Sequence, residues 1–180
     1  MLQLKMNLKR IKKMFKVNKA FAAIRNGDFE ALKKEVEKGF DVNSKSDDFR
    51  NTALQEACLS NNFDIAEYLI KCGADVNICD EDETSPLHLA VIMQNLKICE
   101  LFIKEGADVN KLDLDGNTPL HESVSYGNLE ILTKLVNSGA NVKPYLYGND
   151  GLIARATRWE NHKALDFLRP RLNFDFVATC

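Results

Sequence analysis

The 180-residue sequence contains no apolar run that approaches the roughly 18 residues of a membrane-spanning helix. Basic side chains interrupt its first seventeen residues, so the apolar stretch of a secretory signal is missing there. No Asn-x-Ser/Thr glycosylation sequon occurs. The five cysteines are odd in number and lack the spacing of a disulfide framework. Together these absences predict a reducing, cytoplasmic location.

Net charge is small but unevenly distributed along the chain. The formal net charge is −2, yet residues 1–19 carry seven basic side chains and no acidic one. The remaining residues carry 17 bases against 26 acids, so the body of the protein is acidic. Phosphate contact requires positive charge, and this acidity argues against direct binding of nucleic acid.

What the sequence does contain is a tetrapeptide that recurs at a fixed interval. Ser85-Pro86-Leu87-His88 reappears 33 residues later as Thr118-Pro119-Leu120-His121, and 33 residues earlier as Thr52-Ala53-Leu54-Gln55. A Gly-Ala-Asp-Val-Asn segment keeps the same spacing between 73–77 and 106–110. Self-similarity at this period is typical of a stacked-repeat protein.

Residues 80–110 show what one unit must look like. Ser85 is an N-cap type residue and Pro86 suits the first helical position, so a short helix starts there. Apolar residues at helical spacing predict a second helix after Asn95, and Gly106 ends it as a C′ glycine. An extended hairpin then leads to the next unit. Three cysteines stand at small apolar positions of the units and are interpreted as reduced core thiols: Cys58, Cys72 and Cys99.

The pattern predicts about five units between residues 18 and 170, because a helix pair can bury its apolar faces only by stacking on its neighbours. The first unit has Gly39-Phe40-Asp41-Val42-Asn43 as its tail. The fifth is degenerate, with Leu152-Ile153-Ala154-Arg155 in place of the tetrapeptide, and Pro170 is expected to end its second helix. Residues 171–180 form a C-terminal tail.

The Thr-Pro-Leu-His box, the turn, the leucine-rich second helix and the Gly-Ala-Asp-Val-Asn tail resemble the ankyrin repeat. The resemblance covers about residues 18–170 and is most specific in the third and fourth units. It implies an all-α solenoid of about five helix-turn-helix repeats, with β-hairpin finger loops along one edge and capping repeats at the ends. It also implies that His88 and His121 hydrogen-bond the backbone within and between repeats.

The sequence lacks the known motifs of catalytic, metal-binding and phosphate-binding sites. The histidines have no Cys-x-x-Cys or His-x-x-x-His spacing for a metal, and His162 is interpreted as a surface residue. Asp113-Leu114-Asp115-Gly116 starts like a calcium loop but lacks the later ligands. No phosphate loop and no nucleophile elbow occurs. We therefore predict a protein that is not an enzyme and that needs no cofactor or metal.

The resemblance implies binding through the finger tips and the exposed side of the first helix of each repeat. The residues there are not needed to hold the stack, so they are free to vary. Here large apolar residues alternate with carboxylates at those positions, a composition suited to a protein partner that is basic or carries an apolar anchor. The alternative is that Leu59, Ile92 and Met93 pack on the next repeat, and that Trp159 seals the end of the stack. The candidate partner-binding residues are Asp48, Phe49, Glu81, Asp82, Met93, Leu114, Asp115, Tyr126, Tyr147, Arg158 and Trp159.

Residues 1–17 form a basic amphipathic pattern, with Leu4, Leu8, Ile11 and Phe15 on one side of a helix. We favour a cap over the open end of the first repeat, because a solenoid end must be covered. An anionic membrane surface or a partner groove are the alternatives.

The sequence thus predicts a non-enzymatic protein-protein interaction module that acts as an inhibitor, an antitoxin-like blocker, a scaffold or an adaptor. The alternative is a peripheral membrane-associated factor docked through residues 1–17. No small-molecule substrate is predicted.

Overall fold

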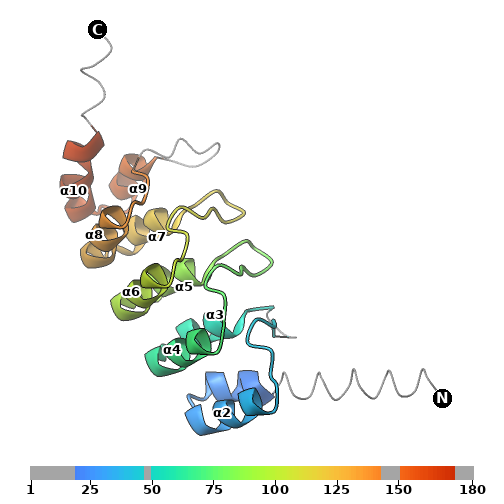
Figure 1. Ribbon diagram of the computed structural model, residues 1–180. Coiled ribbons are helices and arrows are strands. Elements are labelled where there is room, and N and C mark those ends of the chain that lie inside the picture. Colours follow the sequence, from blue (N-terminus) through green and yellow to red (C-terminus); the bar gives the residue numbers. More distant parts are fainter. Residues whose placement is uncertain (1–18, 47–49, 143–150, 173–180) are drawn as a thin grey trace.

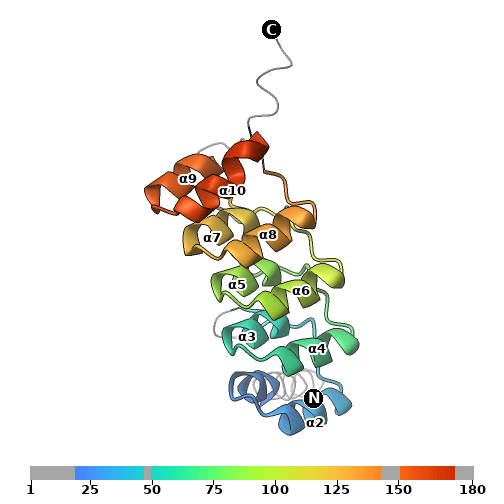
Figure 2. The ribbon, with the colours of Figure 1, turned by 90° about the vertical axis from the view of Figure 1, so that its left-hand side faces the viewer.

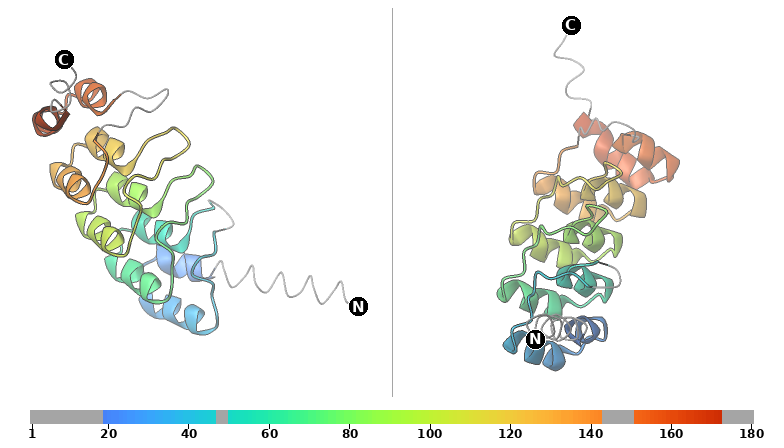
Figure 3. Two further views of the ribbon diagram at one scale, coloured as in Figure 1. Left: turned by 45° about the horizontal axis from the view of Figure 1, so that its top comes forward. Right: turned by 90° about the vertical axis from the view of Figure 1, so that its right-hand side faces the viewer.

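The computed structural model describes residues 19–46, 50–142 and 151–172. Over these residues the chain forms helix pairs that stack in one direction, each pair beside the next (Figure 1). Figure 2 shows the pairs as successive layers, and Figure 3 shows the connecting loops projecting from one edge of the stack. The predicted repeat solenoid is therefore confirmed.

The helices alternate between an inner column beside the loops and an outer column away from them (Figure 1). The inner column begins with helical residues 19–25 and continues with α3 (Ala53–Leu59), α5 (Pro86–Ile92), α7 (Pro119–Tyr126) and α9 (Leu152–Arg158). The outer column contains α2 (Phe29–Glu37), α4 (Phe63–Lys71), α6 (Leu96–Lys104), α8 (Leu129–Asn137) and α10 (His162–Leu172).

Local sequence explains where the helices start. The hydroxyls of Thr52 and Ser85 accept from the backbone N–H three residues on, and the side chains at 55 and 88 return a bond to the cap backbone. Such reciprocal capping boxes satisfy donors that a helix leaves unpaired. The outer helices α4, α6 and α8 start with a one-way cap, in which the side chain of Asn62, Asn95 or Asn128 accepts from a backbone N–H of the first turn.

The turn from inner to outer helix requires one left-handed residue in every unit. Gly127 has φ +77°, and the equivalent Asn61, Gln94 and Glu160 have φ between +51° and +54°. Glycine adopts this region without strain. In the other three residues the hydrogen bonds around the turn offset the strain of the left-handed backbone. Asn62 N–H, for example, donates to Ala57 O at 3.0 Å directly after the turn.

The core runs as one cluster through the whole stack. Leu54, Leu87 and Leu120 of the tetrapeptides are each 1% exposed or less. Isoleucine occupies the equivalent buried site of three successive outer helices, at Ile65, Ile98 and Ile131. Each layer thus buries its apolar faces against the next, as the repeat pattern predicts.

An asparagine brace ties each of the first three layers to the next, at the place where the outer helices lead into the fingers. Asn77 Nδ2 donates to Gly106 O at 3.1 Å, and its Oδ1 accepts from Asp108 N–H at 2.8 Å. Asn43 and Asn110 make the same two contacts with the following tails. The recurring Asn of the tail segment is therefore structural.

Three details differ from the sequence predictions. The fingers contain little strand: within the described part of the chain the one bridge is Lys45–Thr52, and single bonds such as Asp113 N–H to Asn117 O close the others. Helix α10 continues past Pro170 to Leu172, because a proline in the last turn removes only one backbone bond. Cys72, expected in the core, is exposed as the C-cap of α4, whereas Cys58 and Cys99 are buried.

Candidate partner-binding surface

Four large apolar side chains stand exposed at the C-terminal ends of successive inner helices. Their exposed fractions are 43% for Leu59, 39% for Met93, 45% for Tyr126 and 59% for Trp159. The last three are equivalent positions, 33 residues apart, so the stacking of repeats aligns them. We call this set the apolar row. Ile92, which precedes Met93, is half-buried and is not counted in the row.

Ion pairs between neighbouring repeats flank the apolar row. Glu56 accepts two bonds from the Arg25 guanidinium, at 2.8 and 2.9 Å, and its carboxylate is almost fully buried. At the other end of the stack Arg155 lies 3.5 Å from Glu122, with both side chains about 15% exposed. Each pair joins inner helices of adjacent layers and so fixes the surface that carries the row.

Two neighbouring fingers bring carboxylates and leucines together. We call residues 75–85 the second finger and 108–118 the third finger. Leu114, at the tip of the third finger, is 67% exposed, and Leu112 is 41% exposed. Leu114 N–H donates to Asp82 O at 3.0 Å, which ties the two tips to each other. Glu81, Asp82 and Asp115 are exposed around them.

The two fingers are strongly acidic and internally braced. They carry eight carboxylates and one lysine, Lys111, which pairs with Glu83 at 2.6 Å. This lysine lowers the pKa of Glu83 below its usual value. Two of these carboxylates hold the shape of the fingers: Asp80 accepts from the backbone N–H groups of Asp82 and Thr84, and Asp113 accepts from that of Asn117. Because bonds within the fingers hold their shape, little backbone must be ordered on contact.

The tetrapeptide histidines are structural in this geometry. His88 Nδ1 accepts from Ser85 N–H at 3.2 Å, and its Nε2 lies 3.2 Å from Asn117 O in the next repeat. Burial lowers the pKa of His88, so the ring is neutral and suited to this bond. His121 repeats the first contact, with Thr118 N–H, but its buried Nε2 finds no acceptor among the described residues.

The described residues offer no metal-ligating cluster, and their two buried cysteines are inert. No cluster of three or more His, Cys, Asp or Glu side chains suited to a metal occurs there. Burial raises the pKa of Cys99 to about 12 and that of Cys58 well above its ordinary value, so both thiols stay protonated and unreactive. Within the same residues, no helix combines the length and the apolarity needed to traverse a bilayer.

The structure places the predicted site residues in two groups. Met93, Tyr126, Arg158 and Trp159 lie at the ends of the inner helices, and Glu81, Asp82, Leu114 and Asp115 lie on the fingers; all are exposed. Arg50 pairs with Glu81 at 3.0 Å. Packing on the next repeat leaves Met93 39% exposed, and Trp159 is 59% exposed. Asp48, Phe49 and Tyr147 lie outside the described residues.

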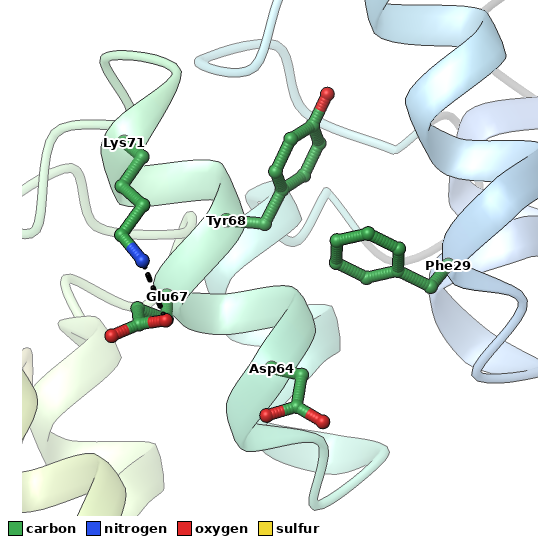
Figure 4. Close-up of a pocket in the computed structure, with 5 residues that line it drawn as sticks. All are labelled: Phe29, Asp64, Glu67, Tyr68 and Lys71. Carbon is green, nitrogen blue, oxygen red and sulfur yellow. Dashed lines mark hydrogen bonds and ion pairs between the residues drawn. The ribbon is translucent and has the colours of Figure 1, made fainter.

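Sequence reasoning left Leu59 and Leu112 out of the site, although both are as exposed as Tyr126 to within a few percent. The signal for Leu59 was its position one residue before the equivalent of Met93. Leu112 has no comparable signal, because leucine at a loop position equally predicts burial. A groove between α2 and α4, on the outer column, had no sequence signal either (Figure 4).

Comparison with known proteins identifies similarity along most of the chain. A family model described as ankyrin repeats (3 copies) matches residues 19–113 and 72–145. Over 68 residues, 38% of its length, the chain is 40% identical to inversin of Gallus gallus and 38% identical to inversin of Homo sapiens. Over 73 residues, 41% of its length, it is 40% identical to the ankyrin repeat protein FPV222 of fowlpox virus (strain NVSL). The matched segments span only 6% of each inversin and 10% of the viral protein.

Proposed function

The chain belongs to the ankyrin-repeat family, and we propose that it binds a partner protein through the apolar row and the two acidic fingers. Members of this family generally bind other proteins and generally are not enzymes. The observation that carries the proposal is the alignment of Met93, Tyr126 and Trp159 on one exposed side of successive repeats. Aromatic and methionine side chains supply most of the binding energy at interface centres.

Partner chemistry follows from what surrounds the row. The partner presents an apolar segment to Met93, Tyr126 and Trp159, and basic side chains to the fingers. Asp82 carries an exposed carboxylate, and Leu114 beside it offers a contact for an apolar anchor. Acidic residues at the rim accelerate encounter with a basic partner more than they tighten the complex. Binding should therefore slow with added salt.

The contact surface belongs to a scaffold that its own hydrogen bonds hold in shape. Binding to it therefore acts by blocking the partner or by tethering it. A blocker of the inhibitor or antitoxin type and a scaffold or adaptor use such a surface equally. We place this activity in the cytoplasm, since Cys58 and Cys99 are free and buried thiols and Cys72 is a free and exposed one.

Affinity capture from the native source tests the proposal. Wild-type protein is compared with a Leu114→Ser, Trp159→Ala variant, which should lose most of the captured partner while keeping its helicity. Leu129→Ser is the matched control, because Leu129 is a 37%-exposed leucine on the outer column. A partner held equally by wild type and by the double variant would show that the surface is wrong.

A second candidate rests on the sequence of residues 1–17, which lie outside the described residues. We propose that this basic amphipathic segment caps the first repeat, and the alternative is docking on an anionic membrane. Co-sedimentation with vesicles containing phosphatidylserine separates the two. Vesicle binding that is lost on deletion of residues 1–17 supports the membrane role, whereas no binding removes it.

A further inference from the structure

A groove of about 330 Å³ opens between the outer helices α2 and α4, on the opposite side of the stack from the fingers (Figures 1 and 4). Its lining residues are Phe29 of α2 and Asp64, Glu67, Tyr68 and Lys71 of α4. The groove lies outside the proposed partner-binding surface. Its volume is at the lower limit of ordinary ligand pockets, so it suits one side chain or a small group.

Two aromatic rings form one wall of the groove. The ring centroids of Phe29 and Tyr68 lie 5.0 Å apart with an interplanar angle of 60°, so the rings meet edge to face. Both side chains are half-buried. The face of an aromatic ring carries partial negative charge and attracts a cation, an arginine guanidinium in particular.

The lining of the groove carries two carboxylates and one cation, all from α4. Asp64 is exposed in the first turn of α4, whereas Glu67 is 2.7 Å from Lys71, the one cation among the five lining side chains. Burial and a hydrogen bond with Cys72 raise the pKa of Tyr68, and the charges of Glu37 and Glu30 on α2 raise it further. The same two acids of α2 attract a cation that binds beside Tyr68.

Equivalent positions in the next two layers do not repeat this arrangement. The position of Tyr68 is held by Leu101 in α6 and by Lys134 in α8, and Lys134 Nζ lies 3.3 Å from Glu100 of the preceding outer helix. Between α6 and α8 the protein thus supplies its own cation across the gap. Between α2 and α4 it supplies aromatic rings and a carboxylate instead.

We propose that the groove between α2 and α4 binds the guanidinium group of an arginine side chain presented by a partner polypeptide. The planar group stacks against the wall formed by Phe29 and Tyr68 and donates hydrogen bonds to the Asp64 carboxylate, its ion-pair partner. Guanidinium fits better than the ammonium of lysine, because it is flat, less strongly hydrated and able to make two parallel bonds to one carboxylate.

Titration with single amino-acid probes tests the site on the full chain. Nα-acetylarginine amide should shift the NMR signals of Phe29 and Tyr68 with a dissociation constant on the order of millimolar, as expected for one side chain. The neutral isostere Nα-acetylcitrulline amide should bind at least about tenfold more weakly, because it has the same shape without the charge. Equal binding of the citrulline probe, or of Nα-acetyllysine amide, would overturn the assignment to guanidinium.

Variants locate the site. Asp64→Asn and Tyr68→Leu should each weaken the arginine probe about two- to fivefold, and Lys71→Gln should tighten it by a similar factor because it releases Glu67. Glu130→Gln is the matched control: it removes an acid at the position of α8 equivalent to Asp64, where no aromatic pair is present. If Glu130→Gln weakens binding as much as Asp64→Asn, the probe responds only to net charge and the proposal fails.

Discussion

The central layers of the stack and its last layer have the same helix-pair shape but are held by different interactions. From α3 to α8 each inner helix starts with a capping box, and Gln55 and His88 each reach a backbone carbonyl of the following repeat, at 2.8 and 3.2 Å. The last inner helix, α9, starts at Gly151 without a side-chain cap. In its place, Arg155 donates to Asn117 Oδ1 at 2.7 Å and to Ser125 Oγ at 3.2 Å.

The difference teaches that a charged side chain can replace a backbone tie at the end of a repeat array. Backbone carbonyls recur in every layer, so Gln55 and His88 can use the same acceptor with different chemistry. Arg155 instead depends on three side chains of the preceding repeat: Asn117, Glu122 and Ser125. The last layer is therefore specified by particular residues, whereas the central layers are specified by the period.

The largest expected loss of stability comes from a cavity in the core, and it should differ between the central layers and the last layer. Leu120→Ala should lower the free energy of unfolding by about 3 kcal/mol, because Leu120 is fully buried between layers. Leu165→Ala in α10 should instead open the last layer alone, since end repeats contact one neighbour. Hydrogen exchange checks this: loss of protection for Leu165→Ala should stay within residues 151–172, and loss throughout the stack would contradict it.

Removal of the guanidinium tests the charged tie. Arg155→Leu should cost about 2 kcal/mol, because Glu122 then stays largely buried without its cation. Burial already raises the pKa of Glu122, and Arg155 opposes this rise, so the variant should raise that pKa further. Adding Glu122→Gln should recover part of the loss in chemical denaturation. Two additive losses would mean that Arg155 and Glu122 do not interact.

Acid should weaken the His121 layer. Burial, together with Arg155, lowers the pKa of His121 from 6.5 to about 4, so between these values the unfolded chain binds a proton that the folded chain does not. Stability is therefore complete above pH 6.5 and is lost as the pH falls toward 4, by about 2 kcal/mol between pH 7 and pH 5. Urea titrations of wild type and His121→Gln at both pH values measure it. A pH-independent difference between them would contradict the shift.

His88 offers a more subtle comparison of the central ties. His88→Ala should cost about 1–2 kcal/mol, because it leaves Asn117 O without its buried donor. His88→Gln should cost much less, since Gln55 makes the equivalent bonds one repeat earlier, to Thr52 N–H at 2.8 Å and to Thr84 O. Thermal unfolding of both variants decides the point. Equal losses would contradict this, because they would show that glutamine does not restore the bond to the next repeat.

The smallest effect concerns the finger surface. Arg50→Gln should change stability by less than about 0.5 kcal/mol, since both partners of the Arg50–Glu81 pair are more than half exposed. It should nevertheless speed association with a basic partner, because it releases the Glu81 carboxylate. Association rates at two salt concentrations measure this effect. A slower rate would show that Arg50 itself contacts the partner.

Much of the framework could be predicted from the sequence. Ser85 and Pro86 start α5 as expected, and Gly106, with φ +89°, follows the end of α6. These features depend on neighbouring residues, which is why they are readable from a single chain. The exposed position of Cys72 was missed, because one repeat position can face the core or cap a helix depending on how the layers meet.

The candidate surface was predictable in part for the same reason. Tyr126 and Trp159 were predicted to be free side chains because they occupy equivalent positions of the 33-residue period, and both are exposed. The tie between Leu114 and Asp82, and the contact of Phe29 with Tyr68, join residues 32 and 39 positions apart and have no local signature.

By itself, the sequence determined a stack of helix pairs, the residues that cap and end them, and the leucines that each layer buries, because these depend on spacing within about 33 residues. Tertiary structure alone decided which free side chains stay exposed, how Arg155 secures the last layer, and where a groove opens between α2 and α4. The reason is physical: such features arise from distances between layers, and those distances are set only when neighbouring repeats pack.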